Sequence, residues 1–306
     1  MSAVLPDSEG ITIERVQIRP DLALNAARLG PADGALIVLL HGFPEFWWSW
    51  RKTMRALAHA GFLAVAPDLR GYGDSDKPTP GTPEGRYDVA TLAEDAKLLI
   101  ETLQTARGRT GEPAVVIAHD WGGAVAWAMP ALFPKVVAKL AILNAPHPMA
   151  FRRSLWRHPS QLFKSWYIFM FQVPGLAERA ILKDPVSMMA RTFLSAAGNR
   201  KAFGRQEFEV YGAAIARPGV LPCALAYYRS MTKALGYADK LAAPIACPVL
   251  VLWGERDPAL GSYLAQEAKQ WCTGPFAVQL YPEAGHWLQQ ESPEPVNAAL
   301  VQFAAG

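Results

Sequence analysis

The chain has 306 residues, of which 51% are hydrophobic and 19% are charged. This balance supplies a large buried core and excludes a mainly disordered protein. The formal net charge is +3, and the lysines and arginines are scattered along the chain, which argues against a nucleic-acid-binding protein.

The N-terminus and the cysteines indicate the compartment. Residues 1–10 show no basic region followed by an apolar stretch, and no run of about 18 consecutive apolar residues occurs. Cys223, Cys247 and Cys272 are odd in number and far apart, without the paired spacing typical of zinc or redox sites. We therefore expect a cytoplasmic protein with no cleaved signal, no membrane span and no metal site.

Short apolar runs rich in β-branched residues alternate with helical stretches, which predicts an α/β fold with a mostly parallel sheet and helices on both faces. Residues 11–18 and 22–29 flank a turn and are expected to form an antiparallel edge pair. Later strands are expected at 35–40, 62–67, 114–118, 140–144, 248–253 and 276–281, which makes about eight strands in all.

Between Asn144 and Pro248 the strand pattern stops and aromatic residues become dense, which indicates helices. A helical insertion between two strands of such a sheet lies over the carboxyl ends of the strands, where open α/β sheets bind their ligands. We therefore predict a core formed by residues 1–147 and 235–306, and a helical cap domain formed by residues 148–234.

Residues 114–126 have the pattern of a buried strand, a tight turn and a helix of small residues. The central residue of such a turn is strained, so the residues two before and two after it must be small; here Ala118 and Gly122 flank Asp120. A carboxylate is ionised at neutral pH and can attack an alkyl carbon without first losing a proton. We interpret Asp120 as a nucleophile and expect no serine-esterase chemistry. The alternative is that Asp120 only caps the following helix.

Two later loops supply partners in the chain order nucleophile, acid, histidine. The buried strand expected at 248–253 leads into a polar loop with Asp257, and the next strand leads to His286. We predict that His286 activates water and that Asp257 orients the His286 ring. Glu255 is the alternative acid.

A loop with one glycine follows the strand expected at 35–40 and has the sequence His41-Gly42-Phe43-Pro44-Glu45. Gly42 would let the backbone pass close to the nucleophile. Pro44 is expected to support the loop, and the sequence does not decide whether the peptide bond before it is cis or trans. We expect the N–H groups of Phe43 and Trp121 to stabilise an oxyanion. The other histidines are interpreted as structural, with His41 and His119 supporting the site through hydrogen bonds.

At this point the chain resembles the epoxide hydrolases of the α/β-hydrolase superfamily over residues 11–305. The resemblance rests on His41-Gly42-Phe43-Pro44-Glu45, Asp68-Leu69-Arg70-Gly71-Tyr72-Gly73-Asp74-Ser75, Ala118-His119-Asp120-Trp121-Gly122-Gly123, Asn144-Ala145-Pro146-His147-Pro148, the segment 253–257 and Gly285-His286. It implies that Asp120 opens an epoxide through a covalent ester, which water then hydrolyses to a diol. No metal or organic cofactor is implied, and the apolar cap favours a small, uncharged, hydrophobic epoxide.

Epoxide hydrolases use two cap tyrosines to hydrogen-bond the oxygen of the ring. Tyr167 resembles the first of these and Tyr228 the second, with the adjacent Tyr227 as the register alternative. The competing interpretation is that these aromatic residues only pack the interior of the cap.

Two other functions fit much of this pattern. A haloalkane dehalogenase would use the same Asp120, Asp257 and His286, with Trp121 holding halide, but Phe43 offers no side-chain donor for the halide. A non-catalytic sensor of hydrophobic ligands would keep the fold and the pocket without turnover. A homodimer joined through the cap is compatible with each of these functions.

Overall fold

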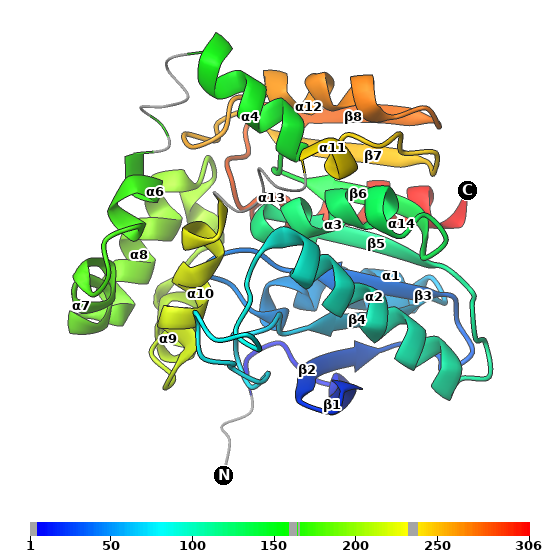
Figure 1. The fold of residues 1–306 in the computed structure, drawn as a ribbon, viewed down its shortest axis with the longest axis horizontal. Helices are drawn as coiled ribbons and strands as arrows, with labels where there is room; N and C mark the ends of the chain where they lie inside the picture. Colours follow the sequence, from blue (N-terminus) through cyan, green and yellow to red (C-terminus); the bar gives the residue numbers. More distant parts are fainter. Residues whose placement is uncertain (1–4, 159–163, 165, 232–237) are drawn as a thin grey trace.

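The computed structural model describes residues 5–158, 164, 166–231 and 238–306. Its centre is one eight-stranded sheet with the strand order β1-β2-β4-β3-β5-β6-β7-β8 (Figure 1). Strands β1 and β2 pair antiparallel at one edge, β2 meets β4 antiparallel, and the other neighbouring strands are parallel. The predicted α/β architecture and the antiparallel edge pair are therefore confirmed.

The strands lie close to their predicted positions. They are β1 Thr12–Arg19, β2 Leu22–Leu29, β3 Leu36–Leu40, β4 Leu63–Pro67, β5 Ala114–His119, β6 Val137–Leu143, β7 Val249–Gly254 and β8 Phe276–Tyr281. The largest difference is in β6, which begins at Val137 and ends before Asn144. Asn144 has a φ of 41°, a left-handed conformation that cannot continue an extended strand.

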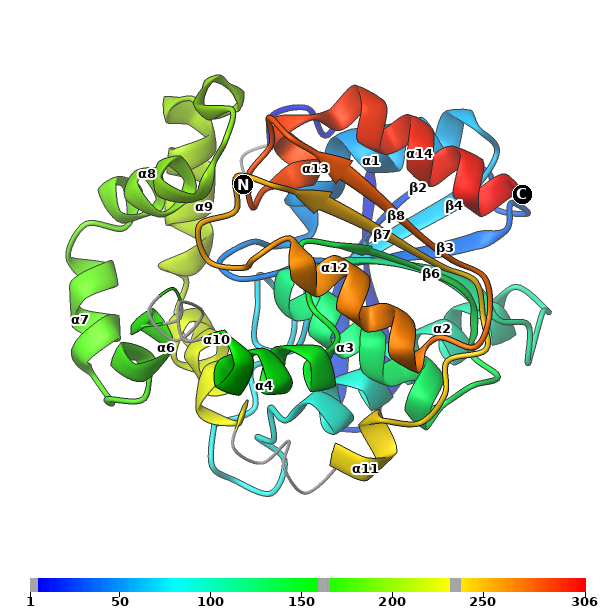
Figure 2. The same ribbon diagram turned by 90° about the horizontal axis from the view of Figure 1, so that it is seen from above.

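Helices cover both faces of the sheet (Figure 2). On one face lie α1 (Arg51–His59) and α14 (Pro293–Ala305), and on the other α2 (Val89–Ala106), α3 (Asp120–Leu132) and α12 (Tyr263–Glu267). The short helices α11 (Ala238–Leu241) and α13 (Leu288–Glu291) and the 3-10 turns η1 (Trp47–Trp50) and η4 (Ala268–Trp271) complete this part of the chain among the described residues.

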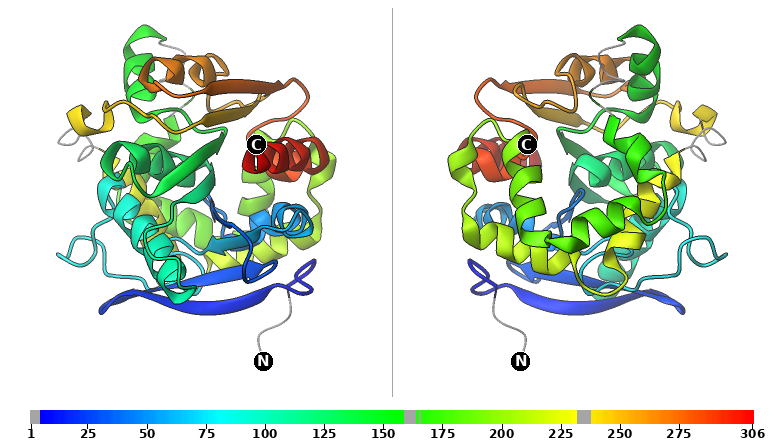
Figure 3. Two further views of the ribbon diagram at one scale, coloured as in Figure 1. Left: turned by 90° about the vertical axis from the view of Figure 1, so that its right-hand side faces the viewer. Right: turned by 90° about the vertical axis from the view of Figure 1, so that its left-hand side faces the viewer.

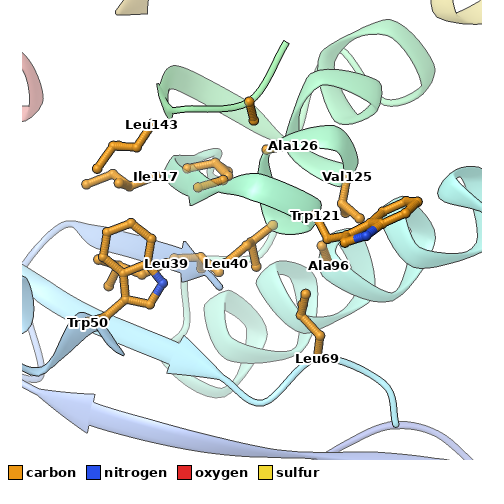
Figure 4. Packing of buried hydrophobic residues seen from close by; sticks show 14 of the residues in the cluster. Leu39, Leu40, Trp50, Leu69, Ala96, Ile117, Trp121, Val125, Ala126 and Leu143 are labelled. Atoms are coloured by element: carbon orange, nitrogen blue, oxygen red, sulfur yellow. The ribbon is translucent and has the colours of Figure 1, made fainter. Parts of the chain in front are cut away.

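Both sides of the central strands are buried because helices pack on each face. All five residues of β3 and all six of β5 are buried. Figure 4 shows Leu39, Leu40 and Ile117 from these strands between Trp50 on one side and Val125 and Ala126 of α3 on the other. Such continuous apolar strands are typical of a parallel sheet.

A run of helices lies between β6 and β7 in the chain and covers the carboxyl end of the sheet (Figure 3, right). It comprises α4 (Pro148–Arg157), α6 (Trp166–Phe171), α7 (Leu176–Lys183), α8 (Pro185–Ala196), η2 (Arg200–Ala202), α9 (Arg205–Ile215) and α10 (Val220–Arg229). The predicted end of the cap, between residues 234 and 235, falls outside the described residues. In the part of the chain that the structure describes, no helix is both long enough and apolar enough to cross a membrane.

Candidate active site

The candidate site lies where the carboxyl ends of parallel strands meet the helices between β6 and β7. The loop after β3 carries Gly42 and Phe43, and β5 leads into Asp120. The loops after β7 and β8 carry Asp257 and His286. Parallel strands bring residues that are far apart in the sequence to one edge of the sheet, which is where open α/β sheets bind ligands.

Asp120 occupies the strained turn between β5 and α3. Its φ is 48°, an unusual value for a residue with a side chain. A Cβ atom on Gly122 would lie 2.3 Å from the carbonyl oxygen of Leu40, so only glycine fits beside the turn. The Asp120 carboxylate accepts a hydrogen bond of 2.8 Å from the N–H of Phe43, which lies in the loop after β3. This geometry favours the predicted exposed nucleophile over a helix cap.

The structure brings Asp120, His286 and Asp257 together in a line. His286 Nδ1 lies 2.7 Å from Asp257 Oδ2, which is hydrogen-bond distance. On the other side of the ring, His286 Nε2 lies 3.6 Å from Asp120 Oδ2, too far for a direct hydrogen bond. The ring is thus held by one carboxylate and faces the other.

Asp257 is fixed by more than the histidine. Its Oδ1 accepts hydrogen bonds from the N–H groups of Ala259 at 2.8 Å and Leu260 at 3.0 Å, and its Oδ2 accepts one from Asn144 Nδ2 at 2.9 Å. The alternative acid, Glu255, is exposed to solvent. The geometry therefore favours Asp257. Asn144 was not predicted as a partner of this group, although its position directly after the buried strand β6 is a usable signal.

The charges in this line shift the pKa values of its members. Burial alone would lower the pKa of His286, but the carboxylates of Asp257 and Asp120 outweigh burial and hold the pKa well above its usual range. Burial alone would raise the pKa of Asp120, but His286, the His119 ring and the N–H of Phe43 lower it below its ordinary value. Asp120 is accordingly ionised at neutral pH.

The loop after β3 approaches Asp120 closely. A Cβ atom on Gly42 would lie 2.4 Å from Asp120 Cβ, so a side chain there would collide with the nucleophile. The peptide bond between Phe43 and Pro44 is cis. His41 is buried behind this loop, where its Nε2 accepts a hydrogen bond from the N–H of Leu69 and its Nδ1 faces the carbonyl of Gly42.

Trp121, the second predicted oxyanion donor, stands in the first turn of α3. Backbone N–H groups in a first turn have no partner within the helix, so this N–H is free to point toward a ligand. In the structure the Asp120 carboxylate accepts a hydrogen bond from the N–H of Phe43, and the Trp121 N–H remains a predicted donor.

The two predicted cap tyrosines lie together above Asp120. The ring of Tyr228 on α10 packs against those of Phe43, Trp121 and Phe171, and its centroid lies 6.1 Å from that of Tyr167 on α6. Burial, followed by the nearby negative charge of Asp120, raises the pKa of both tyrosine hydroxyls, which remain protonated hydrogen-bond donors.

Tyr227, the register alternative, faces a different way. Its hydroxyl donates a hydrogen bond of 2.8 Å to the carbonyl of Arg70 in the core. The geometry favours Tyr228 as the tyrosine at the site.

Comparison with known proteins identifies the group to which this fold and site belong. Residues 35–293 match the family described as alpha/beta hydrolase fold. The chain is 34% identical over 278 residues to epoxide hydrolase 4 of Mus musculus, covering 90% of this chain and 74% of that one. It is 31% identical to epoxide hydrolase A of Mycobacterium tuberculosis, covering 97% and 98% of the two chains.

A solved structure leads to the same group. The crystal structure of epoxide hydrolase A from Mycobacterium thermoresistibile superposes with a TM-score of 0.80 at 32% identity, over 97% of this chain and 98% of that one. The resemblance seen in the sequence motifs is thereby confirmed. The chain belongs to the epoxide hydrolases of the α/β-hydrolase fold family.

Proposed function

We propose that the protein hydrolyses epoxides to vicinal diols through a covalent ester on Asp120. The observation that carries the proposal is that the two carboxylate oxygens of Asp120 have different surroundings. Oδ1 accepts the N–H of Phe43 at 2.8 Å, whereas Oδ2 faces His286 Nε2 across 3.6 Å. Oδ1 is therefore fixed by a hydrogen bond, while Oδ2 is available to attack the substrate.

In the first step Oδ2 of Asp120 attacks a ring carbon of the epoxide, and the carbon–oxygen bond of the ring breaks. The hydroxyls of Tyr167 and Tyr228 hydrogen-bond the departing oxygen and supply its proton. The product of this step is an alkyl ester on Asp120 that retains every atom of the epoxide.

Ester formation removes the negative charge of Asp120 that helps to raise the pKa of His286, so the ring can give up its proton to solvent and act as a base. In the second step His286, oriented by Asp257, takes a proton from a water molecule that attacks the carboxyl carbon of Asp120. Oδ1 carries the negative charge of the tetrahedral intermediate, and the N–H groups of Phe43 and Trp121 stabilise it. Loss of one such donor in comparable sites lowers the rate by about 10²–10³.

Collapse of the intermediate breaks the bond to the alkyl oxygen, which takes the proton held by His286 and leaves as part of the diol. The second proton of the water returns to the tyrosine that protonated the ring oxygen, and Asp120 is regenerated as a carboxylate.

We also infer the organisation and setting of the protein. Residues 148–234 would serve as a cap over a core of residues 1–147 and 235–306. The aromatic rings near Asp120, including Phe43 and Phe171, favour a small hydrophobic epoxide as the substrate, with water as the second. A cytoplasmic location and a homodimer remain predictions, which fractionation and light scattering would test.

A trapping experiment tests the covalent step. His286→Ala should still open styrene oxide but should not hydrolyse the ester, so mass spectrometry should find one adduct with the full mass of the epoxide on Asp120. His286→Ala combined with Asp120→Asn is the matched control and should carry no adduct. An unmodified His286→Ala protein that still binds styrene oxide would refute the proposal.

The same assay separates the two alternatives. With 1-bromobutane, a dehalogenase would release bromide and retain only the butyl group as the adduct. We expect no bromide release, because the Phe43 side chain has no donor for halide. A sensor would bind styrene oxide with neither adduct nor diol.

A further inference from the structure

Charged residues and exposed apolar side chains are both distributed unevenly along the chain. Residues 148–234 contain 13 lysines and arginines and 4 aspartates and glutamates, a net charge of +9, whereas the rest of the chain contains 17 and 23, a net charge of −6. Eight large hydrophobic side chains are exposed among the described residues, and six of them belong to this basic part: Trp156, Phe169, Val173, Leu176, Leu182 and Val186. The proposed reaction accounts for neither feature.

Three of these side chains lie together at the turn between α6 and α7. Phe169 is 62% exposed, Val173 50% and Leu176 48%. Backbone hydrogen bonds close the turn, from the N–H of Gln172 to the carbonyl of Phe169 at 3.1 Å, from Val173 to Met170 at 3.2 Å and from Leu176 to Val173 at 3.4 Å. The three apolar side chains therefore protrude from one short turn as a single patch.

Positive charges lie beside this patch on α7. Leu176, Arg179, Ala180 and Lys183 are all exposed, and their spacing of three and four positions places them on one face of the helix. Arg179 Nε donates to the carbonyl of Gly175 at 2.9 Å, which holds its guanidinium at the turn that carries the patch. The exposed face of α7 is therefore both apolar and basic.

The acidic residues of this region do not neutralise the face. Glu178 is half-buried and forms an ion pair of 2.8 Å with Arg229 of α10. Asp184, directly after α7, accepts a backbone N–H at the start of α8. Within the part of the chain that the structure describes, neither Arg179 nor Lys183 forms an ion pair.

The patch points away from the candidate site. Figure 1 and Figure 2 both place α7 at the outer side of the molecule, far from the sheet. In α6, the rings of Tyr167 and Phe171 lie 5.7 Å apart, and Phe171 is buried. Phe169 is two positions from each of them, about 200° around the helix. One helix therefore carries a predicted site tyrosine on its inner side and the patch on its outer side.

We propose that Phe169, Val173 and Leu176, flanked by Arg179 and Lys183, form a docking face for the surface of a membrane that contains anionic lipids. Protruding apolar side chains enter the boundary between lipid headgroups and acyl chains. Basic side chains beside them are attracted to the negative surface potential of such a membrane. The face offers both kinds of contact within two turns of one helix.

The same features argue against a second copy of the chain as the occupant of this face. In a symmetric dimer a face meets itself, so Arg179 and Lys183 would approach their own counterparts and repel them. A stable protein interface also uses about 20–30 residues on each side, far more than the patch provides. A bilayer has the opposite charge and needs no matching shape.

Docking at this face would bring the candidate site close to the lipid. One helix, about 10 Å across, separates the patch from Tyr167. An uncharged hydrophobic epoxide concentrates in the apolar interior of a bilayer, so docking would bring Asp120 near its substrate. This consequence rests on the proposed function. The docking itself does not, and it is measured without substrate.

Sedimentation with lipid vesicles tests the docking. The wild-type protein should bind vesicles made of equal parts of phosphatidylcholine and phosphatidylserine and should not bind vesicles of phosphatidylcholine alone. Binding should weaken as the salt concentration rises, because salt screens the attraction between exposed charges.

One pair of variants tests the basic residues of the face. Arg179→Gln/Lys183→Gln should weaken binding by about 25-fold, because each basic residue near an anionic surface contributes about 5-fold. Lys52→Gln/Lys269→Gln removes two exposed charges elsewhere in the chain and is the matched control. It should bind nearly as well as the wild type.

A second pair of variants tests the apolar patch. Phe169→Ser should weaken binding by about 10-fold through lost apolar burial. The matched control is Ile13→Ser, which removes an apolar side chain of β1 that is 50% exposed, and its binding should be unchanged. Because all the substituted side chains are exposed, the melting temperatures should stay near that of the wild type.

Three results would overturn the proposal. The first is a lack of binding to the anionic vesicles, and the second is equal weakening by the face variants and their controls. The third is a shift from dimer to monomer in Phe169→Ser, measured by light scattering, with unchanged vesicle binding, which would identify a second copy as the occupant. Hydrolysis of styrene oxide without vesicles is measured in parallel, and its absence in the wild type would indicate failure of the proposed function rather than of the docking.

Discussion

Replacing Gly42 with alanine should separate the Phe43 N–H from Asp120. The new Cβ atom would lie 2.4 Å from Asp120 Cβ and 2.6 Å from Asp120 Oδ1, whereas ordinary contacts begin at 3.4 Å. Relief of this overlap needs a shift of about 1 Å, and shifts of that size can lower catalytic rates by about 10²-fold. A shift of about 1 Å along the hydrogen bond from Phe43 N–H to Asp120 Oδ1 would also stretch it beyond hydrogen-bonding range.

The loss should appear mainly in hydrolysis of the ester, because that is the step in which Asp120 Oδ1 becomes an oxyanion. We expect the hydrolysis rate of Gly42→Ala to fall by about 10²–10³-fold, equivalent to about 3–4 kcal/mol of transition-state stabilisation. Single-turnover mass spectrometry would follow the adduct.

Gly204→Ala is the matched control, because its Cβ would meet only the end of the Glu207 side chain, at 3.3 Å. Wild-type hydrolysis in Gly42→Ala would refute the assignment of the Phe43 N–H as an oxyanion donor.

Two further predictions concern the tyrosines and the dependence on pH. Tyr228→Phe should slow ester formation by about 10²-fold or more, because it removes a proton donor. Tyr227→Phe should lower the free energy of unfolding by about 1 kcal/mol and leave ester formation near the wild-type rate. Equal effects of the two substitutions on ester formation in stopped-flow measurements would contradict the assignment. The pKa of His286 is raised in the folded protein, so protonation of His286 stabilises the folded state. This stabilisation is fully present below about pH 6.5, the pKa of histidine in the unfolded chain, and is lost as the pH rises through the pKa of His286 in the folded protein. Urea unfolding should therefore show a steeper loss of stability above neutral pH in the wild type than in His286→Gln, and parallel curves would count against the raised pKa.

Much of the fold could be predicted because the strands of a parallel sheet are short, apolar and buried on both faces. Strands β2 and β8 lie at their predicted residues, and the others differ by one to three residues at an end. The end of β6 could not be placed from the apolar pattern, because the left-handed conformation of Asn144 depends on what its side chain binds. That side chain bonds Gly254 and Asp257, which are more than 100 residues away in the sequence.

The line of Asp120, His286 and Asp257 could be predicted because each residue lies in the turn or loop that follows a strand of recognisable pattern. Glu45 belongs to the motif of residues 41–45, but the sequence assigns it no role, since nothing local distinguishes a buried glutamate from a solvated one. Its partners include His119 and Gln290, which come from two other loops. Roles that depend on such distant contacts become visible only when the loops are assembled.

The adjacent tyrosines show how such a distant contact decides the position of a site residue. Successive residues on an α-helix point about 100° apart, so only one of Tyr227 and Tyr228 can face Asp120. The Arg70 side chain is held by both carboxylate oxygens of Asp95, at 2.6 and 2.8 Å, so the carbonyl of Arg70 is a fixed acceptor for Tyr227. That hydrogen bond holds Tyr227 toward the core and is one of the contacts that leave Tyr228 facing Asp120.

The same helix also sets the position of the other tyrosine. Gln172, just after α6, donates to the carbonyl of Tyr228 at 3.1 Å, and Arg229 donates to the carbonyl of Phe171 at 2.9 Å. These reciprocal bonds fix α6, and with it Tyr167, against α10. The placement of the two tyrosines is therefore supported by polar contacts that include Asp95 with Arg70 and Arg70 with Tyr227. A substitution at Asp95 should for this reason affect ring opening although Asp95 lies outside the site.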